Sequence, residues 1–373
     1  MLRRQEPGLN PLDTLDLLYN PPMDRVDFRS DTVTWPTPEM REAMARARVG
    51  DDVYGEDPTV CALEDAAAAS VGQPAGLFVA SGTMGNLTAI LAHAGRGDEA
   101  IVGYESHTFQ WEAGGMAALG GVVPHLLPTD DEGRMDPAAV EAAVHGDDPH
   151  RPRSRLILLE NTFGGRSGAA LPPDYFAALR AIATRHGLAV HLDGARLFNA
   201  AVALGVPAST LTRDVDTVTF CLSKGLCAPV GSVLCGPEET IARARRVRKS
   251  LGGGMRQAGV LAAAGLVALE TMIDRLAEDH ALARTLAGRL EALPGLRVAR
   301  VRVRTNIVHF ALASETGLTP DRLVAELRER HRVWLGTYPP HWLRAVTHYW
   351  VGPAEVDRLV AGIEQILGTR RVS

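Results

Sequence analysis

The chain has 373 residues, of which 46% are apolar and 22% charged, as in an ordinary soluble globular protein with a substantial core. Its formal net charge of −5 argues against nucleic acid as the main partner, and no apolar run is long enough to span a membrane. The segment Met1-Leu-Arg-Arg-Gln-Glu-Pro7 has no apolar signal-peptide core, so we expect a cytoplasmic protein.

The four cysteines form no C-x-x-C pair, and three of them fall in or near apolar segments. This usage is typical of reduced core thiols. The spacings predict no zinc site, and the sequence assigns no metal ligand.

Residues 1–25 contain proline and leucine without clear periodicity, and we interpret them as an N-terminal extension. From residue 26 to about 272, short apolar runs alternate with helical stretches such as 173–186. Continuous apolar runs are typical of strands buried on both faces of a mostly parallel sheet. The alternation predicts an α/β doubly wound large domain over 26–272. Its candidate strands are 76–80, 100–103, 156–159, 188–192, 215–220 and 232–235.

A different pattern follows a long helical region over 257–293. An alternating β segment at 297–313 is followed by a helix at 321–330, a strand at 344–350 and a last helix at 353–367. These elements predict a small α+β domain over 273–373.

Polar residues follow the predicted strands at the edge where open α/β sheets bind ligands. Ser81-Gly-Thr-Met-Gly-Asn86 opens a helix whose free amides suit a phosphate, although an ordinary helix cap would look the same. His191-Leu-Asp-Gly-Ala-Arg196 places Asp193 at a strand end. There it could hold a protonated ring nitrogen or simply cap a turn.

The chain has only two lysines, and Lys249 lies in an arginine-rich stretch. Lys224 instead follows the apolar run 218–222, where desolvation can turn an amine into a nucleophile. Taken alone, a lysine that ends a strand is the simpler interpretation. A phosphate loop, then an acid, then a lysine on successive strand ends is the layout that pyridoxal 5′-phosphate (PLP) requires, because its phosphate, ring nitrogen and aldehyde need those groups.

Together these segments resemble the threonine aldolase (β-eliminating lyase) family of fold-type-I PLP enzymes. The resemblance spans about residues 26–260 and adds Arg344 near the C-terminus. It implies an aspartate aminotransferase-like large domain, a small C-terminal domain, and a site at the interface of a homodimer or homotetramer. The matching segments are Phe28-Arg-Ser-Asp-Thr32, Gly50-Asp-Asp-Val-Tyr-Gly-Glu-Asp-Pro58, Ser81–Asn86, His191–Arg196, Leu222-Ser-Lys-Gly225 and Leu251-Gly-Gly-Gly-Met-Arg-Gln257.

The resemblance assigns cofactor-binding roles. Lys224 would hold PLP covalently, Asp193 would pair with its ring nitrogen, and His107 would stack on the ring near the substrate hydroxyl. Without the resemblance, His107 would read as an ordinary core or surface histidine. Gly82 and Thr83 would hold the phosphate.

Other matching residues are assigned to the substrate or to the edge of the site. Ser30, Arg196 and Arg344 would bind the substrate carboxylate, for which the guanidinium fork is suited, and Arg196 would also lie near the cofactor. Tyr54 would form a wall of the site. Arg256 would contact the phosphate or an interface, from a neighbouring subunit.

The implied activity is retro-aldol cleavage of an L-β-hydroxy-α-amino acid, such as threonine or allo-threonine, into glycine and an aldehyde. His107, or a water that it orients, would take the hydroxyl proton. Family members usually carry a histidine after Glu-Asn-Thr, where this chain has Phe163, which cannot accept a proton and would offer an apolar wall to the substrate. The substitution leaves two outcomes open: an aldolase that prefers bulky or aromatic β-substituents, or another PLP reaction at Cα, such as racemisation, transamination or β-elimination.

Rival functions lack a signal of their own. An aminotransferase would need a second, often acidic, substrate site, and a hydroxymethyltransferase would need a folate pocket. A non-enzymatic scaffold is disfavoured because Lys224, Asp193 and His107 occur together.

Overall fold

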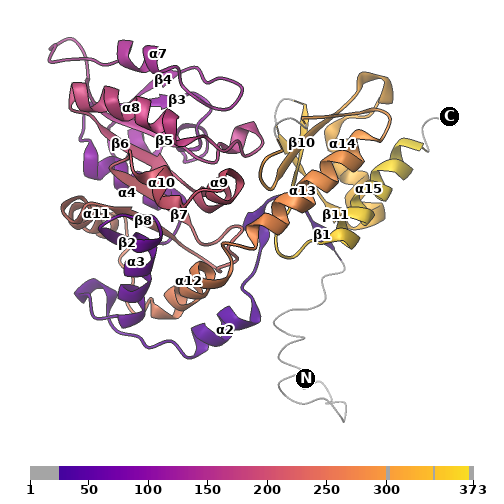
Figure 1. Ribbon diagram of the computed structural model, residues 1–373, viewed down its shortest axis with the longest axis horizontal. Coiled ribbons are helices and arrows are strands. Elements are labelled where there is room, and N and C mark those ends of the chain that lie inside the picture. The colour runs from indigo at the N-terminus through magenta and orange to yellow at the C-terminus, as the bar shows by residue number, and fades with distance from the viewer. Residues whose placement is uncertain (1–24, 300–302, 339–340, 369–373) are drawn as a thin grey trace.

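The computed structural model describes residues 25–299, 303–338 and 341–368, which form two lobes (Figure 1). The predicted N-terminal extension lies outside the described residues except for Arg25. Helix α13 (Leu276–Glu291) leads from the larger lobe into the smaller one.

The larger lobe is built on a seven-stranded sheet of order β2-β8-β7-β6-β5-β3-β4. The strands from β7 to β4 pair in parallel, whereas β8 is antiparallel to β2 and β7. This mostly parallel sheet confirms the predicted α/β class. The strands are β2 (Ala75–Val79), β3 (Asp98–Gly103), β4 (Val123–Leu127), β5 (Arg153–Glu160), β6 (Ala189–Asp193), β7 (Thr217–Cys221) and β8 (Ser232–Gly236).

Alternate strand residues point to opposite faces of the sheet, and both sets are apolar. Helices therefore cover both faces. Ile157 and Val190 belong to the main core with α3 (Pro58–Ser70), α8 (Pro173–His186) and α12 (Gly259–Thr271). Leu77 and Leu234 pack on the other face with α4 (Gly82–His93) and α11 (Glu238–Ser250). The shorter helices are α2 (Pro38–Ala45), α5 (His107–Gln110), α6 (Gly115–Ala118), α7 (Pro137–Ala142), α9 (Leu197–Leu204) and α10 (Ala208–Thr212).

Helix α8 shows how local sequence sets an element. Pro173 begins it with a preset φ, and Gly187 ends it in the left-handed conformation at φ +65°. Tyr175, Phe176 and Leu179 bury its apolar face, and the predicted bounds 173–186 are confirmed.

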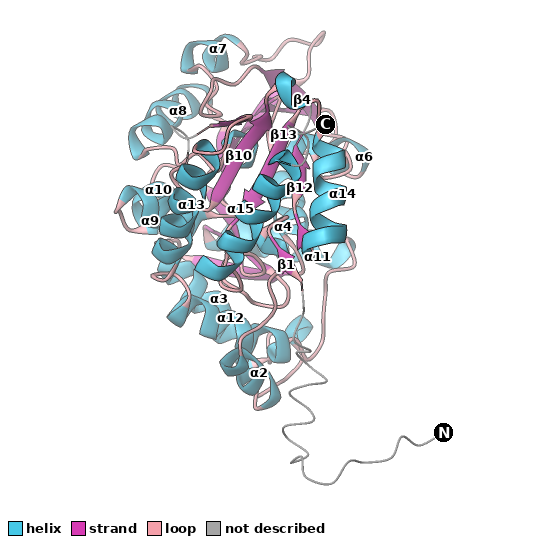
Figure 2. Cartoon of the chain, turned by 90° about the vertical axis from the view of Figure 1, so that its right-hand side faces the viewer, coloured by secondary structure: helices cyan, strands magenta, loops and turns pink. Residues whose placement is uncertain are grey.

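The smaller lobe has an antiparallel sheet of order β12-β13-β10-β9. Figure 2 shows α13, α14 (Pro320–His331) and α15 (Pro353–Gly368) in front of it. A two-stranded parallel pair joins β1 (Val26–Asp27) to β11 (Val333–Trp334), so Val26 and Phe28 lie in the core of this lobe. The other strands are β9 (Leu296–Val298), β10 (Ile307–Leu312), β12 (Gly336–Tyr338) and β13 (Trp342–Val346).

The structure differs from the predicted elements in several places. The strand expected over 344–350 is β13, which ends at Val346, and the β segment expected over 297–313 contains two strands, β9 and β10. The long helical region expected over 257–293 consists of two helices, α12 and α13, separated by residues 272–275. Strand β4 was not predicted, because Pro124 and His125 interrupt its apolar run. Among the described residues, no helix combines the length and apolar character needed to cross a membrane.

Candidate active site

A cavity of about 360 Å³ lies at the carboxyl ends of the parallel strands, between the two lobes. Glu160 and Asp193 end β5 and β6, and Lys224 follows β7, so adjacent strands deliver these side chains to one place. The small lobe closes the cavity with Tyr338 and Arg344. The lining residues are Ser30, Thr32, Glu105, His107, Trp111, Glu160, Thr162, Gly164, Gly165, Asp193, Ala195, Arg196, Lys224, Thr337, Tyr338 and Arg344.

Six residues selected from the sequence meet in this cavity: Ser30, His107, Asp193, Arg196, Lys224 and Arg344. Lys224 lies in the loop after β7. Its carbonyl oxygen accepts hydrogen bonds from the Thr34 hydroxyl at 2.9 Å and from the Cys227 amide at 2.9 Å. These contacts fix the backbone from which the amine enters the cavity.

Asp193 is buried at the end of β6 and is held by two donors. The Asn86 side-chain amide donates to Oδ2 at 2.9 Å, and the Ala195 backbone amide donates to Oδ1 at 3.0 Å. Asn86 comes from α4 and is itself buried. The carboxylate therefore has a fixed orientation toward the cavity, with lone pairs left for one more donor.

A buried chain of hydrogen bonds stands behind Asn86. His191 Nε2 lies 3.1 Å from Asn86 Oδ1, and His191 Nδ1 lies 2.9 Å from the Thr217 hydroxyl. Burial lowers the pKa of His191 to about 3, so the ring is neutral. Because Asn86 Oδ1 can only accept, Nε2 carries the proton and the Thr217 hydroxyl donates to Nδ1. The donors thus run from Thr217 through His191 and Asn86 toward Asp193, and the Asn86 amide also donates to Glu112 Oε1 at 2.8 Å.

His107 is held by two carboxylates. Its Nδ1 lies 2.9 Å from Glu112 Oε1, and its backbone amide donates to Glu160 Oε2 at 2.7 Å. Burial disfavours the imidazolium, but Glu112, Asp193 and Glu160 outweigh it and raise the pKa of His107. Burial and the charge of Asp193 raise the pKa of Glu160 to about 7.

A guanidinium pair lies on the side of the small lobe. Arg196 forms a two-pronged ion pair with the buried Asp31, through Nε at 2.7 Å and Nη2 at 2.5 Å. Burial would raise the pKa of Asp31, but Arg196 overrides it and holds that pKa well below its usual range. Burial and the charge of Arg196 lower the pKa of Arg344 to about 10. Because Asp31 balances only one of the two positive charges, the pair suits a carboxylate ligand.

The N-terminus of α4 has the form expected of a phosphate site. The Ser81 hydroxyl caps it by accepting from the Met84 amide at 3.1 Å. The amides of Gly82 and Thr83 precede any intrahelical acceptor and are left for a ligand. A Cβ on Gly82 would come within 2.9 Å of Cys221 Sγ, so the helix begins close against β7.

Five of the residues assigned from the sequence are not among the residues that line the cavity: Gly82 and Thr83 at the start of α4, and Tyr54, Arg256 and Phe163. Tyr54 is 74% exposed in a short 3₁₀ turn, and Arg256 is 54% exposed with its guanidinium on Asp51 at 2.9 Å. Phe163 is only 1% exposed, and its ring packs on Gly133, where an added Cβ would come within 2.2 Å of it. The wall expected from Phe163 is instead backbone at Gly164 and Gly165.

Asn86, Glu112, Glu160 and Asp31 were given no role from the sequence. Asn86 and Asp31 lie within the matched segments, and Glu160 precedes the Asn-Thr-Phe run. The motifs therefore indicate that these positions belong to the site, but not which residues they contact. Glu112 had no signal, because its contact with His107 depends on the turn after α5.

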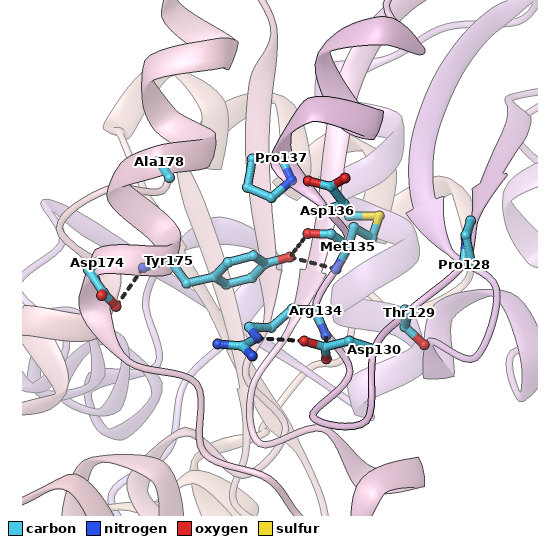
Figure 3. A pocket seen from close by; sticks show the side chains of 10 residues that line it. All are labelled: Pro128, Thr129, Asp130, Arg134, Met135, Asp136, Pro137, Asp174, Tyr175 and Ala178. Atoms are coloured by element: carbon cyan, nitrogen blue, oxygen red, sulfur yellow. Dashed lines mark hydrogen bonds and ion pairs between the residues drawn. The ribbon is translucent and has the colours of Figure 1, made fainter.

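A second cavity, of about 640 Å³, lies beside α8 (Figure 3). The Tyr175 hydroxyl meets the backbone of Met135, and Arg134 is paired with Asp130 at 2.8 Å. No lysine, histidine or cysteine lines it. It therefore lacks the amine and the imidazole that line the smaller cavity, which is the better candidate for chemistry.

The family comparison covers most of the chain. The model of the family described as "Beta-eliminating lyase" matches residues 27–313. The probable low-specificity L-threonine aldolase 2 of Arabidopsis thaliana is 44% identical over 344 residues, which are 91% of this chain and 97% of that protein. The low-specificity L-threonine aldolase of Escherichia coli (strain K12) is 42% identical over 336 residues, which are 90% of this chain and 97% of that protein.

Solved structures agree on the fold. A Leishmania major threonine aldolase superposes with a TM-score of 0.77 at 23% identity, covering 92% of this chain and 99% of that chain. A Sphingomonas wittichii serine palmitoyltransferase superposes with a TM-score of 0.71 at 18% identity, covering 93% and 88% respectively. At these identities the likeness establishes the fold, which is that of fold-type-I enzymes.

Proposed function

The chain belongs to the threonine aldolase (β-eliminating lyase) family, and on that premise we propose that it cleaves an L-β-hydroxy-α-amino acid of the threonine or allo-threonine type into glycine and an aldehyde, with PLP as cofactor. One observation carries this proposal: an amine, a buried carboxylate, an imidazole and a guanidinium pair surround one cavity. Each group matches one demand of that reaction.

The residues present fit PLP. Lys224 offers the amine for its aldehyde, Asp193 the acid for its ring nitrogen, and Gly82 and Thr83 the amides for its phosphate. A cavity of about 360 Å³ lies in the range of small-molecule sites. When bound, PLP supplies an electron sink that stabilises the negative charge left at the substrate Cα.

Asp193 and its supporting chain hold the position of the ring nitrogen. Asn86 and Ala195 fix the carboxylate, and the neutral His191 fixes Asn86. This support keeps an acceptor aimed at one point of the cavity. Asp193 can then hold a proton at the ring nitrogen.

The guanidinium pair orients the amino acid. Arg344 Nε is buried and has no hydrogen-bond partner among the described residues, so a carboxylate oxygen would supply the missing acceptor. The remaining donors of Arg196 and the Ser30 hydroxyl lie on the same wall. Holding the carboxylate there would turn the β-hydroxyl toward the rest of the cavity, which His107 also lines.

His107 is our candidate for the proton transfer at the β-hydroxyl, directly or through a water that it orients. Its Nδ1 is engaged by Glu112, which leaves Nε2 for the hydroxyl. Glu160 accepts from the His107 backbone amide and also from the Gly164 amide at 2.8 Å. It therefore connects the part of the cavity lining that contains His107 to the part that contains Gly164. Glu160 acts through these contacts as a positioning residue.

Phe163 bears on the choice of substrate. Its ring packs on Gly133 and does not line the cavity, and the adjoining wall is backbone at Gly164 and Gly165, with the Tyr338 hydroxyl against Gly165. We therefore propose that His107 manages the hydroxyl proton without a second histidine, and that β-substituents larger than methyl are accepted. The alternative outcome, another PLP reaction at Cα, would release no aldehyde.

Assembly into at least a homodimer is part of the proposal. Tyr54, Arg256 and Trp111 are all more than half exposed, and Trp111 is on the cavity wall. A neighbouring subunit that covers these residues would bury apolar surface and could bring its Arg256 to the phosphate. A tetramer would contain two such pairs.

The chain's two lysines allow a direct test of the cofactor assignment. Borohydride reduction of the PLP-loaded protein should leave the cofactor on the peptide that contains Lys224, as read by mass spectrometry. Lys224→Ala should lose that label and its aldehyde release, whereas Lys249→Ala, a change on the exposed face of α11, should keep both. Ordinary turnover by Lys224→Ala would refute the assignment.

A further inference from the structure

Glu99 is a buried carboxylate whose neighbours are two imidazoles rather than a lysine or arginine. It lies near the start of β3, and its side chain is close to His125 and His145. The nearby Arg153 and Arg155 are directed at Asp98 instead, at 3.5 and 4.0 Å. No residue of the proposed aldolase machinery is involved.

Three separate segments build this cluster. Glu99 is on β3, His125 is on the adjacent parallel strand β4, and His145 follows α7. In the β3–β4 register Glu99 is opposite Val123 and Ile101 is opposite His125, so Glu99 and His125 point to the same face of the sheet. Figure 1 shows β3, β4 and α7 together at one edge of the large lobe.

The distances are those of ligands around a shared ion. His125 Nδ1 lies 3.3 Å from Glu99 Oε1, and His145 Nδ1 lies 3.3 Å from Glu99 Oε2. Two ligands bound to Zn²⁺ at 2.0–2.1 Å with tetrahedral angles lie about 3.3–3.4 Å apart. All three ligand atoms lie within 4.8 Å of one another.

His145 provides the second observation. Its Nδ1 is buried and makes no hydrogen bond with any described residue, although it faces the Glu99 carboxylate. A buried ring nitrogen without a partner costs free energy unless a ligand satisfies it. The side chains of His145 and His125 are 17% and 27% exposed, which leaves a path for an ion.

Outer contacts hold the carboxylate in place. The Ser154 hydroxyl donates to Glu99 Oε1 at 2.8 Å and accepts from the His145 backbone amide at 2.9 Å. One serine thus fixes both a carboxylate ligand and the segment that carries an imidazole ligand. Metal sites depend on such second contacts for ligand orientation.

We propose that Glu99, His125 and His145 bind one divalent first-row transition-metal ion, with water completing its coordination. Two imidazoles and one carboxylate suit Zn²⁺ and its neighbours in the row, and not Mg²⁺ or Ca²⁺, which prefer oxygen ligands alone. The ion would join β3, β4 and the segment after α7. The site is at the opposite end of β3 from the cavity, so its role is structural.

The test is metal binding by the PLP-loaded protein after treatment with a chelator. One equivalent of Co²⁺ should bind and give the visible absorption of a low-coordinate site, and Zn²⁺ should displace it. His145→Ala should weaken Zn²⁺ binding by about 100-fold or more, and Ser154→Ala by about tenfold. Glu99→Gln provides a second ligand variant. The matched control is His150→Ala, which removes a nearby exposed imidazole.

Zn²⁺ alone should also raise the unfolding temperature of the wild type and of His150→Ala, but not that of His145→Ala. Mg²⁺ should not raise the unfolding temperature of any of the three proteins. Measurements in a Cys61→Ser background remove the exposed thiol as a competing ligand. Equal Zn²⁺ affinity in the wild type and His145→Ala would overturn the proposal. So would the absence of stoichiometric binding by the wild type.

Discussion

Arg196 and Arg344 are both largely buried and line the same cavity, and Asp31 is the carboxylate whose charge acts on both. Asp31 also accepts from the Asn306 side chain at 3.1 Å, so it ties both lobes to the guanidinium pair. Like charges held this close are costly unless an anion arrives. At the scale of single residues, this imbalance is the clearest feature that selects a substrate.

Arg344→Ala should therefore raise KM for the amino acid by about 10- to 100-fold, since a hydrogen bond to a charged group contributes about 1.5–3 kcal/mol. Arg344→Lys should recover part of this loss, because it keeps the charge without the fork. Arg322→Ala, on the exposed face of α14, is the control. Steady-state kinetics with unchanged KM in Arg344→Ala would contradict the assignment.

His191 makes stability depend on pH in a defined direction. Its folded-state pKa of about 3 lies below the usual value of 6.5, so the unfolded chain takes up the proton first as pH falls. The stability that the neutral ring contributes is full above pH 6.5 and is lost as pH falls toward 3. Between pH 7 and pH 5 this loss is about 2 kcal/mol.

His191→Gln removes this titration. The variant should be less stable than the wild type at pH 7, because it disrupts the contact with Asn86. The difference in the free energy of unfolding should shrink by about 2 kcal/mol at pH 5, as measured by urea unfolding at both pH values. A difference that does not change with pH would show that His191 is not buried as a neutral ring.

At the scale of elements, α4 and β7 approach so closely that the contact depends on a glycine. A Cβ on Gly85 would lie 2.5 Å from Thr219 Cγ2, closer than real atoms pack. The approach sets both the amides of Gly82 and Thr83 and the side chain of Asn86 against the strand ends. One helix thus positions the candidate phosphate site and the support of Asp193.

Gly85→Ala should lower the free energy of unfolding by about 1–3 kcal/mol and weaken PLP binding, because the helix must move outward. Adding Thr219→Ala to the Gly85→Ala variant should restore much of the lost stability and of the PLP binding, since it removes the clashing methyl group. Gly288→Ala is the matched control, because Gly288 is helical with open space around it, and it should stabilise by about 0.5–1 kcal/mol. Additive effects of Gly85→Ala and Thr219→Ala would argue against the contact.

Elements with a clear local signal were predictable, and those defined by tertiary contact were not. Apolar strands such as β6, and α8 with its proline and glycine ends, are visible in the sequence. Strand β4 is not, because its side chains are only half-buried and Pro124 interrupts it. The break between α12 and α13 falls where the chain leaves the large lobe, which periodicity alone does not mark.

At the scale of the whole molecule, the candidate site needs both lobes. The motifs predicted which residues of the large lobe meet, because parallel strands end at one edge. They did not predict that the chain enters the small lobe first, through the β1–β11 pair, and then delivers Ser30 to the cavity and Asp31 to Arg196. Contacts such as Asp31 with Asn306 depend on that path and have no local signature.

Mixed oligomers test whether subunits share the site. If Arg256 serves the neighbouring subunit, a dimer of one Lys224→Ala chain and one Arg256→Ala chain contains one intact site. Co-refolding equal amounts of the two inactive variants should then recover about a quarter of wild-type turnover, because half of the dimers are mixed. No recovery, with mixed dimers shown by mass spectrometry, would mean that Arg256 acts only within its own chain.

The most direct measurement is aldehyde and glycine release by the PLP-loaded protein from L-threonine, L-allo-threonine and β-phenylserine. We expect equal amounts of both products, with β-phenylserine accepted because neither Gly164 nor Gly165 adds a side chain of its own to the cavity wall. Loaded protein that releases no aldehyde from any of the three would contradict the aldolase function. The cofactor site would then remain, serving a different reaction at Cα.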